Sequence, residues 1–122
     1  MQGKRFITLV VLIFIMAPLV SGCAVRLGGM TAISTKNVSL NTVDLDKMPQ
    51  TKNVVGTDSR FVFIFIPLGF PTVQGAVDDA LDKGQGDVIL DAVLQAESWW
   101  FIIGQNSLTV KGHVVNTKGA AK

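Results

Sequence analysis

Two reactive residue types are scarce in this chain, which has one cysteine and one histidine among its 122 residues. A lone cysteine cannot form a disulfide within the chain. His113 falls on the polar side of an expected strand, and no serine stands in a nucleophile-elbow sequence. The acidic cluster of Asp78, Asp79 and Asp82 lacks the spacing of a calcium-binding loop. We therefore predict no catalytic residues, no metal site and no cofactor.

Excess charge is also lacking once the N-terminal segment is set aside. The chain has eleven basic and nine acidic residues, and removal of Lys4 and Arg5 leaves nine of each. A surface without net positive charge has no electrostatic attraction for a polyanion, so nucleic acid is excluded as an expected partner.

The N-terminal 22 residues have the layout of a signal peptide. Lys4 and Arg5 precede an uncharged apolar run over residues 6–19, and the small residues Ser21 and Gly22 follow. The run has 14 residues, whereas a membrane-spanning helix needs about 20. Residues 1–22 are therefore predicted to be a cleavable signal.

The sequence Val20-Ser21-Gly22-Cys23 resembles the bacterial lipobox. This resemblance implies a diacylglyceryl group on the Cys23 thiol, cleavage between Gly22 and Cys23, and acylation of the new amino terminus. Two or more acyl chains anchor a protein stably. Ala24 in place of aspartate implies sorting to the outer membrane. Two other interpretations remain open, namely an ordinary buried free cysteine and an uncleaved signal anchor.

Residue patterns divide the remaining chain into three parts. Residues 23–36 contain Gly28-Gly29 and little periodicity, which predicts the lipidated N-terminus and a flexible tether. Residues 37–117 are expected to form one small domain, and residues 118–122 a frayed tail. The first strand of the domain is predicted over residues 37–43, followed by a loop over residues 44–53.

One amphipathic helix is predicted after Pro71. Five apolar residues recur at helical spacing, and they are Val73, Ala76, Val77, Ala80 and Leu81. Gly84 is expected to end the helix in the left-handed conformation.

Alternating segments at residues 87–98 and 108–116 predict an antiparallel hairpin with its turn at residues 104–107. Gly112 is expected to mark a bulge or a close approach of two chain segments. The predicted fold class is therefore α+β, with one helix on a small antiparallel sheet of about four strands.

Two apolar stretches leave their environment open. Phe61, Phe63 and Phe65 would line one face of a strand over residues 60–66, with Val62, Ile64 and Ile66 on the other. This pattern fits a buried central strand, or a strand whose phenylalanines face a partner or lipid. The stretch 99–103 begins with Trp99, Trp100 and Phe101. It fits a long ribbon, a lid over the core, or a surface exposed to a protein or the bilayer.

Several short motifs carry a family resemblance. They are Pro67-Leu68-Gly69, residues 76–81, residues 99–104 and Val110-Lys111-Gly112. With the lipobox in front, this order resembles small bacterial lipoproteins of the TRL-like sort and, more loosely, Bor-type envelope lipoproteins. The resemblance implies a location in the cell envelope and no established activity.

These patterns together predict a non-enzymatic, lipid-anchored envelope protein on the periplasmic side of the outer membrane. It would act through contacts with an unidentified envelope protein. The candidate contact residues are Trp99, Trp100, Phe101, Phe61, Phe63 and Phe65. The alternative is a small periplasmic ligand- or lipid-binding module that uses space between the helix and the sheet.

Overall fold

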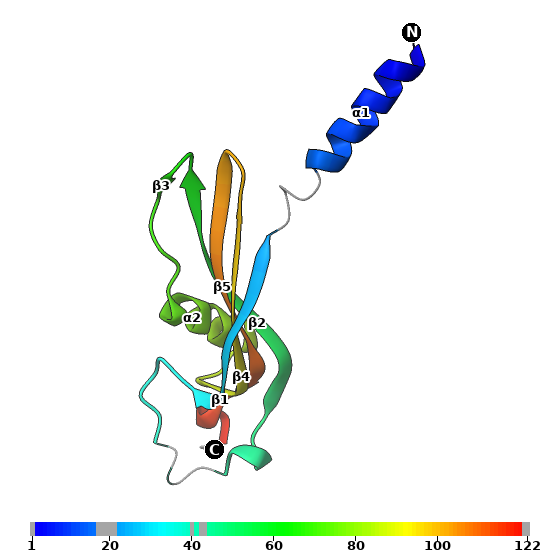
Figure 1. Ribbon diagram of the computed structural model, residues 1–122. Coiled ribbons are helices and arrows are strands. Elements are labelled where there is room, and N and C mark those ends of the chain that lie inside the picture. The colour runs from blue at the N-terminus through cyan, green and yellow to red at the C-terminus, as the bar shows by residue number, and fades with distance from the viewer. Residues whose placement is uncertain (1, 17–21, 40, 42–43, 121–122) are drawn as a thin grey trace.

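The computed structural model describes residues 2–16, 22–39, 41 and 44–120. Within these residues five strands form one antiparallel sheet in the order β1-β4-β5-β2-β3, with helix α2 packed against it (Figure 1). The strands are β1 (Cys23–Ile33), β2 (Gln50–Phe63), β3 (Ile66–Pro67), β4 (Val88–Trp100) and β5 (Ile103–Val115). The helices are α1 (Gln2–Met16), η3 (Leu45–Lys47), α2 (Val73–Gly84) and η4 (Thr117–Ala120). The predicted α+β class is confirmed, with five strands instead of about four.

Helix α2 forms where the apolar periodicity predicted it. Thr72 caps its N-terminus by accepting a hydrogen bond from the Gly75 amide at 3.0 Å. Four of the five predicted stripe residues are fully buried against the sheet, namely Ala76, Val77, Ala80 and Leu81. The sheet side of this core consists of Val54, Ile89, Ala92, Leu94, Val110 and Val114. The interface between α2 and the sheet holds most of the buried apolar side chains. Burial of each of the larger ones contributes about 1.5–3 kcal/mol.

Glycines let the helix approach the sheet closely. A Cβ atom on Gly56 of β2 would lie 2.1 Å from the Ala76 carbonyl oxygen, and one on Gly84 would lie 2.3 Å from Val114 Cβ. The predicted role of Gly84 as a left-handed cap is wrong. Gln85 adopts that conformation, with φ at 53°, and Gly84 is the last helical residue because only a hydrogen fits against Val114.

A β-bulge changes which residues of β4 face the helix. The pairing of β4 with β5 shifts register between Leu90 and Val93, and Asp91 has a φ of 50°. Ile89 therefore shares the core with Ala92 and Leu94, whereas uninterrupted alternation along a strand would place Ile89 and Ala92 on opposite faces. Gly112 lies opposite this bulge, and a Cβ there would be 2.5 Å from Ile89 Cγ2, which confirms the predicted close approach.

Asp58 joins β2 to the start of α2. Its carboxylate accepts hydrogen bonds from the Thr72 amide at 2.9 Å and the Thr72 hydroxyl at 3.0 Å, and it pairs with Arg60 at 3.3 Å. The pKa of Asp58 lies below its usual value of 3.8, mainly because its carboxylate accepts a hydrogen bond from the Thr72 amide. Burial of Asp58 opposes this shift, whereas the Thr72 hydroxyl and the positive charge of Arg60 lower the pKa further. A charged, nearly buried group therefore holds the helix N-terminus in place.

The tether predicted over residues 23–36 is wrong. Residues 23–33 form β1, which pairs with β4 along its length and lies at the edge of the sheet. Most of β1 is exposed on both faces, and its register shifts between Arg26 and Gly28, so its sequence lacks the alternation that marks a half-buried strand. The folded domain therefore begins at residue 23 and not at residue 37.

The strand predicted over residues 37–43 is also wrong. Residues 37–39 and 41 form no strand, while Leu40, Thr42 and Val43 lie outside the described residues. At the other end, the frayed tail predicted from Lys118 begins with the turn η4. Asp87 holds this turn by accepting hydrogen bonds from the Thr117 amide at 2.8 Å and its hydroxyl at 2.6 Å. Ala121 and Lys122 lie outside the described residues.

Two segments rich in turn-forming residues are continuous strand, and the hairpin turn predicted at residues 104–107 is wrong. Residues 56–59, rich in turn-forming residues, lie inside β2, and residues 104–107 lie inside β5. The loop expected over residues 44–53 also gives way to β2 from Gln50 onward. Pairing with a neighbouring strand overrides local turn preference at these positions.

We predict that Gly56→Ala lowers the free energy of unfolding by at least about 2 kcal/mol, because the added methyl group overlaps the backbone of α2. Urea unfolding of the purified protein measures this difference. Gly28→Ala is the matched control, since a Cβ there meets nothing within 4 Å, and we expect its stability within about 0.5 kcal/mol of wild type. Equal effects of the two substitutions would contradict the close packing of α2 on β2.

We predict that Asp58→Asn lowers the free energy of unfolding at pH 7 by about 1–2 kcal/mol, because the Thr72 donors lose a charged acceptor. The folded pKa of Asp58 is depressed, so its contribution is complete above its pKa in the unfolded chain. The contribution is lost as the pH falls below about 4 through the lowered folded pKa. The difference between variant and wild type should therefore shrink in urea titrations at acid pH.

The exposed Asp91, which also sits in a conformation that asparagine adopts readily, supplies the control. We expect Asp91→Asn to stay within about 0.5 kcal/mol of wild type at pH 7. An Asp58→Asn difference that persists unchanged to low pH would exclude the charge as its cause.

Candidate functional site

Cys23, the predicted lipid attachment residue, is the first residue of the edge strand β1. It is exposed, and in the sheet it pairs with Ser98 near the end of β4. A Cβ atom on Gly22 would lie 3.1 Å from Trp99 Cβ, so the predicted cleavage point lies against the first tryptophan. Val20 and Ser21, which begin the lipobox-like sequence, lie outside the described residues.

Helix α1 precedes this point and contributes nothing to the core. From Gly3 to Met16 its side chains are exposed, including nearly all of the apolar run. Figure 1 shows α1 apart from the sheet and α2. Among the described residues, no helix combines the length and the hydropathy required to cross a bilayer.

The candidate contact residues gather where two hairpins end. The chain turns at residues 64–65 between β2 and β3 and at residues 101–102 between β4 and β5. Ten large apolar side chains are exposed at these ends, and we call this surface the apolar tip. Its members are Phe61, Phe63, Ile64, Phe65, Ile66, Trp99, Trp100, Phe101, Ile102 and Ile103.

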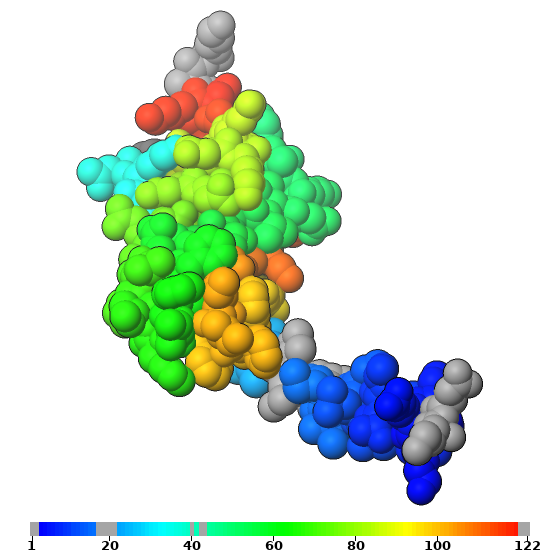
Figure 2. Space-filling model, turned by 90° about the horizontal axis from the view of Figure 1, so that it is seen from above, coloured from blue at the N-terminus to red at the C-terminus, as the bar shows by residue number. Residues whose placement is uncertain are grey.

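Specific contacts hold the two hairpin ends together. The Ile64 amide donates a hydrogen bond to the Ile102 carbonyl at 2.9 Å, and Trp100 Nε1 donates to the Ile64 carbonyl at 2.7 Å. The Phe65 and Trp100 rings lie with their centroids 5.0 Å apart at an interplanar angle of 32°. In Figure 2 the two hairpin ends, green and orange, form one continuous surface. The tip is therefore one built surface and not two unrelated loops.

The buried central strand considered for residues 60–66 is wrong. Phe61, Phe63 and Phe65 are exposed to 57%, 51% and 77%, and β2 already ends at Phe63. The phenylalanines are accessible, and the other interpretation, in which they face a partner or lipid, stays a prediction. Val62, Ile64 and Ile66 were expected on the opposite face of one strand, but the turn brings Ile64 and Ile66 into the same tip.

Trp99 and Trp100 extend β4 into a long ribbon with β5, which was one of the three arrangements considered for residues 99–103. Both side chains are a little under half exposed, at 43% and 47%, so they form no lid over the core. Ile102 and Ile103 are exposed as well, although the candidate contact residues chosen from the stretch 99–103 did not include them. The available signal was that residues 99–103 are all apolar, so a chain reversal within this stretch leaves apolar side chains at the turn.

An apolar groove lies beside Cys23, with a volume of about 340 Å³. Val25 of β1, Ala96 of β4 and Leu108 of β5 contribute to its lining on the sheet side. Phe70 and Pro71, which precede α2, contribute to the other side. The predicted attachment residue thus opens onto apolar surface.

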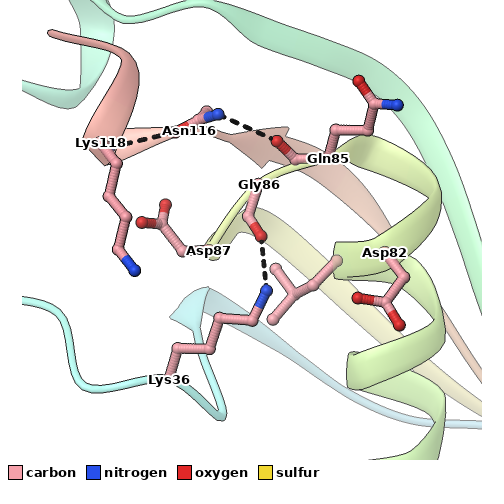
Figure 3. Close-up of a pocket in the computed structure, with 8 residues that line it drawn as sticks. Lys36, Asp82, Gln85, Gly86, Asp87, Asn116 and Lys118 are labelled. Atoms are coloured by element: carbon pink, nitrogen blue, oxygen red, sulfur yellow. Dashed lines mark hydrogen bonds between the residues drawn. The ribbon is translucent and has the colours of Figure 1, made fainter.

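A second cavity, of about 300 Å³, is polar and lies at the C-terminal end of α2 (Figure 3). Its polar groups largely bind one another. Lys36 Nζ donates to the Gly86 carbonyl at 3.0 Å, and Asn116 Nδ2 donates to the Gln85 carbonyl at 3.1 Å. Asp87 is engaged by Thr117. These contacts close the helix end and η4 onto the sheet, which is a structural role.

The histidine and two aspartates considered for chemistry are held in structural contacts. His113 Nδ1 accepts a hydrogen bond from the Asn53 amide at 3.2 Å. Asp79 accepts from Lys83 at 2.6 Å and from the Thr57 amide at 2.8 Å, and Asp78 accepts from the Thr35 hydroxyl. Across the described part of the chain, no three histidine, cysteine or acidic residues are grouped as a metal site would require.

Comparison with known proteins finds no match to a family model, a curated protein or a solved structure. The resemblance to TRL-like and Bor-type lipoproteins therefore rests on the residues of this chain alone. The site defined by its geometry consists of Cys23, the groove beside it and the apolar tip.

Proposed function

We propose that the chain is a non-enzymatic, lipid-anchored envelope protein held by acyl chains on Cys23, on the periplasmic side of the outer membrane. One observation carries the proposal. Cys23 is both the lipobox cysteine and the first residue of the folded sheet. Cleavage before Cys23 would remove α1 and leave every strand and α2 in place.

The distribution of buried residues supports such cleavage. The apolar core lies between Val54 and Val115, and no residue of α1 from Gly3 onward is even partly buried. A helix that exposes apolar side chains all round is unstable in water but suits a segment handled within a membrane. Removal of α1 therefore takes nothing from the apolar core of the domain.

Contacts with an unidentified envelope protein remain part of the proposal. Surfaces available for them are the apolar tip and the free edge of β1, whose outer backbone groups are not used within the sheet. The alternative ligand-binding module requires space between α2 and the sheet. Val77 and Leu81 are fully buried there and share one core with Leu94, so side chains fill that space.

We predict that the mature protein purified from bacterial membranes begins at Cys23 and carries acyl groups on its thiol and amino terminus. Intact-protein mass spectrometry and membrane fractionation provide the measurement. Cys23→Ser should abolish the lipid mass and release the domain from the membrane fraction, because a hydroxyl cannot accept the thioether-linked anchor.

Ala24→Ser is the control for a change beside the processing point, and it should leave both acylation and membrane association intact. The proposal fails if wild-type protein retains its N-terminal methionine and an unmodified Cys23.

A further inference from the structure

Strand register places the predicted anchor level with a defined row of the sheet. Cys23 of β1 pairs with Ser98 of β4, Ser98 pairs with Asn106 of β5, and Asn106 pairs with Arg60 of β2. These four residues form a row across four strands. Acyl chains on Cys23 would leave the protein at this row.

The row separates a part of the molecule without charged side chains from a part that has them. On the tip side, residues 61–68 and 99–105 contain no charged side chain. Arg60 lies in the row itself, and Glu97 lies one position beyond it on the side away from the tip. A charged side chain in hydrocarbon is costly, so the boundary falls where a bilayer surface would require it.

The dimensions of the tip fit one leaflet. Phe101 is three residues beyond Ser98, which at about 3.3 Å per residue places the end of the ribbon about 10 Å from the row. Interfacial segments typically bury their apolar faces about 5–10 Å into a membrane. The tip is therefore long enough to reach the acyl chains and too short to cross the bilayer.

Both faces of the sheet are apolar at the tip. Phe61, Phe63 and Trp99 share the face away from α2, as the pairing of Phe61 and Trp99 with Gln105 requires. Trp100 alternates to the other face and packs against Phe65. A protein partner normally covers one face, whereas lipid surrounds an inserted segment. Tryptophan is also favoured at the membrane interface.

The turn at Ile64 retains its apolar side chain at a conformational cost. Ile64 has a φ of 56°, a region that branched side chains rarely adopt and that glycine, asparagine or aspartate would occupy with less strain. An exposed isoleucine here contributes nothing to the core. An apolar environment around the tip, such as lipid, would explain an isoleucine at position 64.

From this geometry we infer that the apolar tip inserts into the phospholipid leaflet that holds the lipid on Cys23, so that the domain has two adjoining attachments to one membrane. The inference rests on the proposed lipid anchor, and it assigns the tip to lipid instead of a protein. The long axis of the β4–β5 ribbon then stands out from the membrane, with α2 and the polar cavity in the periplasm.

Tryptophan fluorescence tests the inference directly, because Trp99 and Trp100 are the two tryptophans of the chain and both belong to the tip. The lipidated protein is reconstituted into vesicles of phosphatidylethanolamine and phosphatidylglycerol, with or without bromine on the acyl chains. Bromine quenches indoles that reach the chains. We expect brominated vesicles to reduce the emission at least about twofold, because tryptophans favour the interface.

Two variants with the same change in charge form a matched pair. Ile64→Asp changes an exposed residue at the tip, and Asn53→Asp changes an exposed residue near the other end of β2. Both residues have a φ near 56°, a conformation that aspartate adopts readily. Ile64→Asp should lose most of the bromine quenching while keeping its lipid and its unfolding midpoint in urea. Asn53→Asp should be quenched like wild type.

The outcomes separate the inference from the function on which it rests. If the wild type floats with the vesicles but its tryptophans are not quenched by bromine, the inserted tip is excluded and the lipid anchor stands. If the protein neither floats nor carries lipid, the proposed function itself fails. Tryptophans shielded from aqueous iodide yet untouched by bromine would indicate a second copy of the chain on the tip, which also overturns the inference.

A photo-crosslinking residue in place of Phe101 provides a test in cells. Adducts with phospholipid support insertion. An adduct with one envelope protein in place of phospholipid would overturn it and assign the tip to that protein.

Discussion

Pairing of β1 with β4 is the interaction on which the arrangement of the functional surface depends. Without it, the predicted lipid attachment residue would be separated from the domain by a flexible segment, and its position would say nothing about orientation. With it, hydrogen bonds along β1 hold Cys23 at a known register beside Ser98 and next to Trp99. The direction of the sheet and the position of the predicted lipid attachment residue are therefore coupled by main-chain geometry.

The two ends of the sheet differ in what covers them. The packing of α2 on β2, β4 and β5 stabilises the far end of the sheet, where glycines at positions 56 and 84 permit close contact. This leaves the near ends of two hairpins to project without a helix over them. The apolar residues at those ends are held by contacts between Ile64, Trp100 and Ile102, and they lie at the end of the sheet where β1 begins. An anchor and an apolar surface at one end suit attachment to a single membrane.

Sequence reasoning succeeded where the signal was local. The spacing of apolar residues from Val73 to Leu81 predicted α2, because a helix repeats over a few residues and needs no distant partner to reveal its buried face. It failed at β1, which is mostly exposed on both faces and is defined by pairing with residues 56 to 75 positions away. It also placed the hairpin turn at the polar residues 104–107, whereas the register of β4 with β5 puts the turn at two apolar residues.

The sequence by itself determined the α+β class, the helix, the lack of a second cysteine for a disulfide within the given chain, and the lipobox resemblance of residues 20–23. These follow from residue identity and short-range periodicity. The exposure of Trp99, Trp100 and the phenylalanines, and their position at the end of the sheet where β1 begins, were decided only by tertiary structure. The physical reason is that an apolar strand end has the same sequence whether a core or a membrane covers it, and only strand register shows that no part of the described core reaches it.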